Sequence, residues 1–118
     1  MDRKDCIFCR IADGDIPSAL LYEDEDVAAF RDLNPQAPVH ILIIPKKHIA
    51  SVAELSAEDA PLMGKLCLVA KTLAEKEGIA ESGYRLIANS RGDSGQEVPH
   101  LHFHLIGGRF LGPFTTQE

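Results

Sequence analysis

The fold of this chain is decided by Val98-Pro99-His100-Leu101-His102-Phe103-His104-Leu105-Ile106, a stretch that alternates three of the chain's five histidines with apolar residues. Successive side chains of a β-strand point to opposite faces of a sheet. A strand here would place His100, His102 and His104 on one face and apolar residues on the other. Imidazole titrates near neutral pH and serves as nucleophile, proton carrier or metal ligand. The stretch therefore predicts a strand that carries a reactive site.

The pattern by itself leaves three interpretations of the histidines open. They could be hydrogen-bonded core residues, metal ligands at positions i and i+2, or a nucleophilic site. The loop over residues 90–96 directly precedes the stretch, and its Gly92 and Gly95 allow a backbone to approach a ligand closely. Consecutive N–H groups in such a turn can bind an anion. The loop therefore favours a phosphate ligand beside the histidines.

The composition is that of one globular domain of 118 residues, with 45% hydrophobic and 25% charged residues, which excludes a disordered chain. The net charge of -6 disfavours binding to a nucleic acid backbone. The first residues are charged, and no apolar stretch has the length of a signal peptide or a membrane span. We therefore expect a cytoplasmic protein with neither nucleic acid nor membrane as a partner. Three cysteines favour thiols or a metal site over disulfides.

Apolar runs and turn residues predict the strands of one sheet. The predicted strands are residues 19–23, 27–31, 41–44, 84–89 and the histidine stretch. The acidic residues 24–26 are expected to form a turn, and the run 41–44 predicts a central strand that is covered on both faces and stopped by Pro45. Lys46 and Lys47 are expected on the solvated surface.

Two helices are predicted, a short one over residues 6–12 and a long one that begins after Ser56 and ends near Gly78. The apolar positions that would form the buried stripe of the long helix are Leu62, Leu66, Val69, Ala70 and Leu73. We expect Cys67 on the same helix to be in the core. The predicted fold class is α+β, with a mainly antiparallel five-stranded sheet, one long helix and a short N-terminal helix.

The histidine stretch resembles the signature of the histidine triad (HIT) family, His-φ-His-φ-His-φ-φ, where φ is apolar. Other motifs resemble the nucleotide-binding Hint branch of that family. They are Cys6-Ile7-Phe8-Cys9, Asp15-Ile16-Pro17, Phe30-Arg31-Asp32, Pro35-Gln36-Ala37-Pro38-Val39-His40, Ile44-Pro45-Lys46-Lys47-His48-Ile49, Gly83-Tyr84-Arg85 and Gly95-Gln96-Glu97-Val98. The resemblance covers nearly the whole chain and implies a single HIT domain over residues 1–118.

The resemblance implies a homodimeric hydrolase that cleaves adenosine or guanosine 5'-monophosphoramidates through a covalent nucleotidyl-histidine. His102 would attack the α-phosphorus. His104 would bind phosphate oxygens and assist proton transfer to the leaving amine, with His40 supporting the same network. The implied substrate-binding residues are Phe8, Ile11, Ile16, Phe30 and Leu33 around the base, Asp32 at the ribose, and Asn89, Gly95, Gln96 and Val98 with His102 and His104 around the phosphate.

Cys6 and Cys9 allow three interpretations: a thioredoxin-like redox pair, half of a zinc site, or two thiols buried under a short helix. The resemblance favours zinc, because some members of the family bind it with this pattern. The remaining ligands would be His48 and His100, which complete a tetrahedral structural site. His100 would then anchor the histidine stretch, and the chemistry would fall to His102 and His104. No organic cofactor is expected.

Two positions depart from the family pattern. Glu97 stands where many relatives have a serine that contacts the phosphate or the leaving group. Pro99 replaces a tyrosine, removes one donor from the sheet and predicts an edge or a bulge before the histidines. The tail over residues 110–113 resembles bacterial relatives, and in the family this tail can reach the site of the partner. Two alternative functions remain, a dinucleoside polyphosphate hydrolase and a nucleotide-binding regulatory or scaffold protein with incidental hydrolysis.

Overall fold

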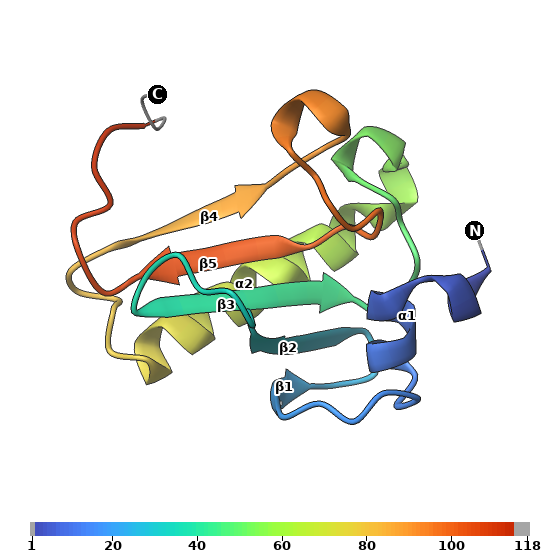
Figure 1. Ribbon diagram of the computed structural model, residues 1–118, viewed down its shortest axis with the longest axis horizontal. Coiled ribbons are helices and arrows are strands. Elements are labelled where there is room, and N and C mark those ends of the chain that lie inside the picture. Colours follow the sequence, from blue (N-terminus) through green and yellow to red (C-terminus); the bar gives the residue numbers. More distant parts are fainter. Residues whose placement is uncertain (1, 115–118) are drawn as a thin grey trace.

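The computed structural model describes residues 2–114 and contains one antiparallel sheet (Figure 1). Its five strands lie in the order β1-β2-β3-β5-β4. Their bounds are Leu20–Glu23 for β1, Val27–Arg31 for β2, Val39–Pro45 for β3, Tyr84–Ala88 for β4 and Phe103–Gly107 for β5. All four pairings between neighbours are antiparallel. The predicted α+β fold class is therefore confirmed.

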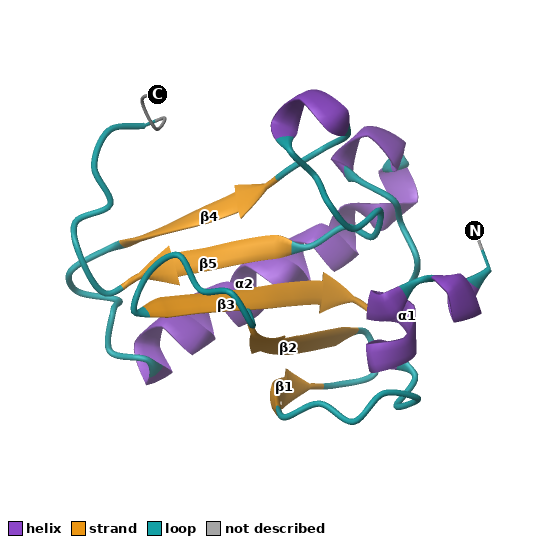
Figure 2. Cartoon of the chain, viewed as in Figure 1, coloured by secondary structure: helices purple, strands orange, loops and turns teal. Residues whose placement is uncertain are grey.

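A long helix lies across one face of the sheet, and a short one lies over one end of the other face (Figure 2). The long helix α2 spans Ala60–Lys76, and the short N-terminal helix α1 spans Ile7–Ala12. The remaining helical turns are the 3₁₀ segments η1 (Arg3–Asp5), η2 (Val52–Glu54), η3 (Ala57–Asp59) and η4 (Gly92–Ser94). Helix α2 packs on one face and α1 on the other, so the molecule has two separate apolar clusters. No helix within residues 2–114 is long and apolar enough to cross a membrane.

Strand β3 is the centre of the sheet, and all seven of its residues are buried. Ile41 and Ile43 belong to the cluster under α2, whereas Leu42 and Ile44 belong to the cluster under α1. A continuous apolar run is therefore needed, because both faces of this strand are covered. Pro45 is the last residue of the strand and still pairs with Val27, so the strand includes the proline predicted to stop it.

The buried stripe of α2 agrees with the prediction, with one exception. Residues Leu66, Val69, Ala70 and Leu73 are buried, and Leu62 packs against them. Cys67, however, is exposed, so its predicted core position was wrong. Each helical residue advances by about 100° around the axis, and a residue next to Leu66 therefore points away from the sheet.

The start of α2 is also more elaborate than predicted. Ser56 and Asp59 form a capping box, and the 3₁₀ turn η3 lies between Ser56 and the first residue of the helix. The helix ends before Gly78, which has a φ of +75° and reverses the chain. The predicted start after Ser56 and end near Gly78 therefore bound the whole helical segment.

Only the second half of the histidine stretch joins the sheet, because the chain bends over residues 98–100. Strand β5 begins at Phe103, and the backbone N–H of His100 donates to the carbonyl of Val98 across Pro99 at 2.8 Å. Alternation continues through the break, since Leu101 and Leu105 are both buried in the cluster under α2. The histidines consequently face the side of the sheet that carries α1.

Candidate active site

A cavity of about 660 Å³ lies on the α1 face of the sheet. Its walls come from α1, the segment before β1, the sheet itself and the loop that precedes the histidine stretch. All residues expected to bind substrate line it, namely Phe8, Ile11, Ile16, Phe30, Asp32, Leu33, Asn89, Gly95, Gln96, Val98, His102 and His104, and His40 lines it as well. The fold therefore brings together side chains from both halves of the sequence in one cavity.

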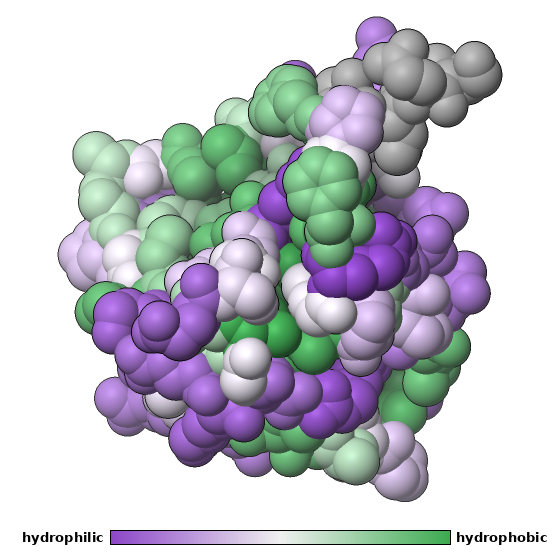
Figure 3. Space-filling view, turned by 90° about the vertical axis from the view of Figure 1, so that its left-hand side faces the viewer, coloured by the Kyte–Doolittle hydropathy of each residue, from purple (hydrophilic) through white to green (hydrophobic). Residues whose placement is uncertain are grey.

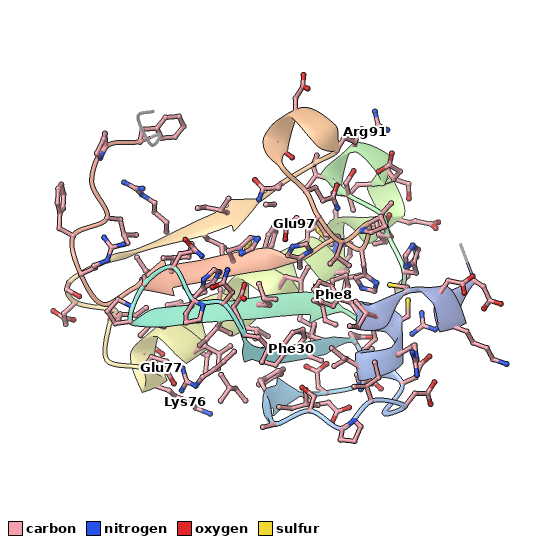
Figure 4. The ribbon with its side chains drawn as sticks, viewed as in Figure 1. Phe8, Phe30, Lys76, Glu77, Arg91 and Glu97 are labelled. Carbon is pink, nitrogen blue, oxygen red and sulfur yellow. The ribbon has the colours of Figure 1, made fainter. Side chains whose placement is uncertain are left out.

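The end of the cavity next to α1 is apolar. Phe8 of α1 and Phe30 of β2 meet edge to face with ring centroids 5.6 Å apart, as the labelled side chains in Figure 4 indicate. Ile11 and Ile16 line the same wall, and Leu33 is fully exposed at the opening. Such a slot has the chemistry to hold a flat aromatic ring.

Hydrogen bonding sets the tautomer of His102, which is buried against the Phe8 ring. Its Nδ1 lies 2.7 Å from the backbone carbonyl oxygen of His100. A carbonyl can only accept, so Nδ1 carries the proton and donates it. The other nitrogen, Nε2, is left with a free lone pair on a ring that lines the cavity. This is the form of imidazole that can act as a nucleophile.

A chain of hydrogen bonds gives His104 the other tautomer, in which Nε2 carries the proton. The backbone N–H of Gln36 donates to Nδ1 of His40 at 3.0 Å, so the proton of His40 sits on Nε2. That atom lies 2.9 Å from Nδ1 of His104, which accepts from it. The proton of His104 is therefore on Nε2, and its ring also lines the cavity. The cavity thus contains a lone pair on His102 and an N–H donor on His104, with ring centroids 4.9 Å apart.

The surroundings keep His104 neutral. Burial lowers the pKa of its imidazole to about 4, and the neighbouring rings of His102 and His40 act in the same direction. Asp32 opposes them, with a carboxylate oxygen 3.3 Å from Nε2 of His40. At neutral pH His104 is consequently a hydrogen-bond donor without charge.

Asp32, His40 and His104 are also close enough in space to suggest a metal site, but their hydrogen bonds argue against one. A metal on Nε2 of His40 would move the imidazole proton to Nδ1. The N–H of Gln36 already points at that nitrogen, and two hydrogens cannot share the contact. This group is better described as a hydrogen-bonded relay.

The glycine-bearing loop is held to the cavity by Gln96. Its side-chain amide donates to the carbonyls of Ala50 at 2.7 Å and Val98 at 3.0 Å, and its oxygen accepts the backbone N–H of Arg91 at 2.7 Å. Gly95 follows the 3₁₀ turn with a φ of +85°, a value that favours glycine. Gln96 therefore shapes the loop through its side chain while it lines the cavity.

Two features of this site escaped sequence reasoning. One is the backbone N–H of Gln36, which determines the nitrogen that carries the proton in His40 and, through it, in His104. The other is Arg91, whose φ of +66° makes it the sole non-glycine residue with positive φ among residues 2–114. A main-chain N–H carries no sequence signal, and an arginine gives no hint of a left-handed backbone.

Cys6, Cys9, His48 and His100 converge beside the cavity, with their ligand atoms within 4.8 Å of one another. The sulfur of Cys6 lies 3.3 Å from Nδ1 of His100, and the sulfur of Cys9 lies 3.2 Å from Nδ1 of His48 and 3.5 Å from Nδ1 of His100. A sulfur and a nitrogen bound to one tetrahedral zinc ion are separated by about 3.5 Å, given bond lengths of about 2.3 and 2.1 Å. The observed separations fit that geometry.

The donor chemistry of this cluster fits a metal as well. Nε2 of His100 lies 2.8 Å from the carbonyl oxygen of Pro45, so it donates and leaves Nδ1 as a lone pair toward the sulfurs. Burial lowers the pKa of His100 to about 4, which keeps that lone pair free of a proton. Burial, together with the contact to Cys6, raises the pKa of Cys9 to about 11, so without a cation this thiol stays protonated. The four residues can therefore hold a metal ion.

Comparison with known proteins places this geometry in a family. Residues 13–111 match the HIT domain. The chain belongs to the HIT family. The matched range contains all five histidines, whereas Cys6 and Cys9 lie before it.

Individual HIT proteins resemble the chain over nearly its full length. It is 53% identical to the purine nucleoside phosphoramidase of Escherichia coli K12 over 115 residues, which is 98% of this chain and 97% of the relative. A solved HIT family hydrolase from Legionella pneumophila is 50% identical, with a TM-score of 0.89 over 91% of this chain and 96% of its own. A histidine triad protein from Clostridium difficile is 44% identical, with a TM-score of 0.92 over 98% and 100% of the two chains.

Proposed function

We propose that this HIT hydrolase cleaves purine nucleoside 5'-phosphoramidates through a nucleotidyl-histidine intermediate on His102. The observation that carries the proposal is the pairing of a lone pair on His102 with an N–H donor on His104 in one cavity. The Escherichia coli relative named above as a purine nucleoside phosphoramidase supports the choice of substrate. The apolar end of the cavity, which Phe8 and Phe30 line, would hold the purine, and Asp32 would accept from the ribose hydroxyls.

The reaction would proceed in two displacements at phosphorus. In the first, Nε2 of His102 attacks the α-phosphorus and the P–N bond of the substrate breaks, with its electron pair passing to the leaving nitrogen. That nitrogen gains a proton through His104, whose Nε2–H also binds a phosphate oxygen. In the second, water attacks phosphorus, its extra proton returns to His104, and His102 regains its lone pair. The products are an amine and a nucleoside monophosphate.

Turnover of an adenosine 5'-phosphoramidate by wild type and by His102→Ala tests this proposal. We expect wild-type turnover with a covalent adenylyl-protein that mass spectrometry detects after a rapid acid quench. The variant should show no adduct and a loss of at least about a thousandfold in kcat/KM. Cys67→Ser, which changes an exposed residue outside the cavity, is the matched control. A wild type that binds AMP without turnover would support the scaffold alternative, and cleavage of a dinucleoside polyphosphate alone would support the other hydrolase.

We also propose that the cluster of two cysteines and two histidines binds a structural zinc ion. When bound, the metal would fix the four side chains and contribute to stability without touching the substrate. His100 would be held in place by the ion and by Pro45, and its backbone carbonyl would hold His102. Metal analysis of the purified protein tests the proposal. We expect about one zinc per chain in wild type and none in a Cys6→Ser, Cys9→Ser variant, and a metal-free wild type would refute it.

Homodimerisation is the third part of the proposal, and β4 is the edge that supports it. This strand pairs only with β5 within the described residues, and its Tyr84 and Leu86 side chains are 39% and 36% exposed. Unpaired sheet edges with apolar side chains favour pairing with a second chain. Viewed from the end of the molecule that carries the C-terminal segment, apolar groups lie exposed among charged ones (Figure 3). Light scattering of wild type and Leu86→Lys should give a dimer and a monomer, respectively, and a monomeric wild type would refute this part.

A further inference from the structure

One carboxylate on the wall of the cavity has no part in the proposed reaction. Glu97 lies on the loop between β4 and β5, is exposed, and lines the cavity (Figure 4). It has no ion pair or side-chain hydrogen bond with any other residue in the range 2–114. A charged group held at a ligand cavity without a protein partner is available to interact with the ligand.

The other charges of the cavity make its field negative. Within the described part of the chain, the lining residues with formal charge are Arg31, Asp32 and Glu97. The guanidinium of Arg31 is already engaged, because it donates to both carboxylate oxygens of Glu77 at 3.0 and 2.9 Å. His104 adds no positive charge, since its pKa is lowered to about 4. Two carboxylates are thus left facing the ligand, a poor environment for a chain of several phosphates.

The order of strands locates Glu97 relative to the reacting atoms. Phe30 is on β2, at the apolar end, and His104 is on β5, two strands further along the sheet. Asn89 follows directly after β4, which lies beyond β5, and it lines the cavity with Glu97. A nucleotide with its base against Phe8 and Phe30 and its phosphorus at the histidines would therefore direct its leaving group toward β4 and Glu97.

We propose that Glu97 selects the leaving group and makes the enzyme prefer phosphoramidates whose leaving amine carries an additional positive charge. The inference rests on the proposed function and specifies its substrate class. An ammonium group on the leaving amine would meet an unpaired carboxylate, whereas a carboxylate or phosphate on it would be repelled. The same repulsion disfavours dinucleoside polyphosphates, in which the leaving group is itself a nucleotide.

Three adenosine 5'-phosphoramidates with leaving amines of equal length test the proposal. One amine ends in an ammonium, one in a neutral amide and one in a carboxylate. We expect wild-type kcat/KM to fall in that order. Glu97→Gln should lower the cation-to-anion ratio of kcat/KM by about tenfold, an effect that shrinks at high ionic strength because salt screens exposed charges. Glu97→Lys should reverse the order.

The matched control is Glu81→Gln, which removes an exposed carboxylate that does not line the cavity and should leave the ratio as in wild type. If wild type and Glu97→Gln cleave all three compounds with the same ratio, the selectivity is refuted while the proposed function stands. If wild type cleaves none of them, the proposed function fails and the selectivity fails with it. A reversed order in Glu97→Lys that disappears in high salt would support a direct charge effect.

Discussion

The partly buried His104 predicts a loss of stability in mildly acidic solution. Its pKa is about 4 in the folded protein, against 6.5 for an ordinary histidine, because burial disfavours the charged ring. Between these values the unfolded chain binds a proton that the folded protein does not, so the free energy of unfolding falls as the pH falls. Above pH 6.5 neither state is protonated and the contribution is complete.

The size of the effect follows from the two pKa values. Each unit of difference between the folded and unfolded pKa is worth about 1.4 kcal/mol. A drop from about pH 7 to about pH 5 crosses only part of the range between the two pKa values, so the free energy of unfolding would fall by roughly 1.8 kcal/mol. His104 is only partly buried at the cavity, and solvent reduces the cost of charging it. We therefore expect about 1 kcal/mol from this residue.

Urea unfolding of wild type and His104→Asn at these two pH values measures the effect. Asparagine retains an acceptor for Nε2–H of His40 but does not titrate. Wild type should lose about 1 kcal/mol more than the variant between the two conditions, at equal protein concentration. The other two histidines with a lowered pKa, His48 and His100, are common to both proteins, so their contributions cancel. Equal losses in the two proteins would refute the reasoning, because His104 would then titrate as it does in the unfolded chain.

Two further predictions concern backbone positions. A Cβ at Gly107 would lie 2.8 Å from Cδ1 of Ile79, so Gly107→Ala should lower the free energy of unfolding in urea by about 1 to 3 kcal/mol. Adding Ile79→Val, which removes that atom, should recover part of the loss. If the effects of the two substitutions were simply additive, the clash would be contradicted. Arg91 has a φ of +66°, which costs a non-glycine residue about 1 to 3 kcal/mol, and its ion pair with Glu54 is exposed. Arg91→Gly should therefore melt above Arg91→Ala, and the reverse order would show that the backbone is not strained.

Alternation of side chains was sufficient to predict which residues face which layer. The strand Val27–Arg31 was predicted with its observed bounds, because an acidic turn precedes its apolar run, and its first four residues are buried in the two clusters. Periodicity was less successful at Cys67, where an apolar residue type was taken as a sign of burial although its helical phase points outward. The late start of β5 at Phe103 could not be read from alternation, because an extended chain alternates whether or not it is paired.

For the candidate site, the sequence was enough to name the side chains but not their protonation. The side chains around the cavity could be named from the resemblance to the HIT family, and they converge in the fold. Their protonation could not be named, because it is set by main-chain groups at Gln36, His100 and Pro45. Every residue except proline has the same backbone N–H and every residue has the same carbonyl, so only the folded geometry determines which one meets an imidazole.

His100 shows how these main-chain contacts connect the two halves of the site. Its side chain lies between the sulfurs of Cys6 and Cys9 and the carbonyl of Pro45, while its own carbonyl accepts the proton of His102. The orientation of that carbonyl follows the placement of the ring, because both belong to one residue in a fully buried position. A displacement of the ring would therefore weaken the bond that keeps the proton on Nδ1 of His102. In the proposed reaction only the tautomer with a free Nε2 attacks phosphorus, so the cluster of cysteines and histidines would affect that chemistry without touching the substrate.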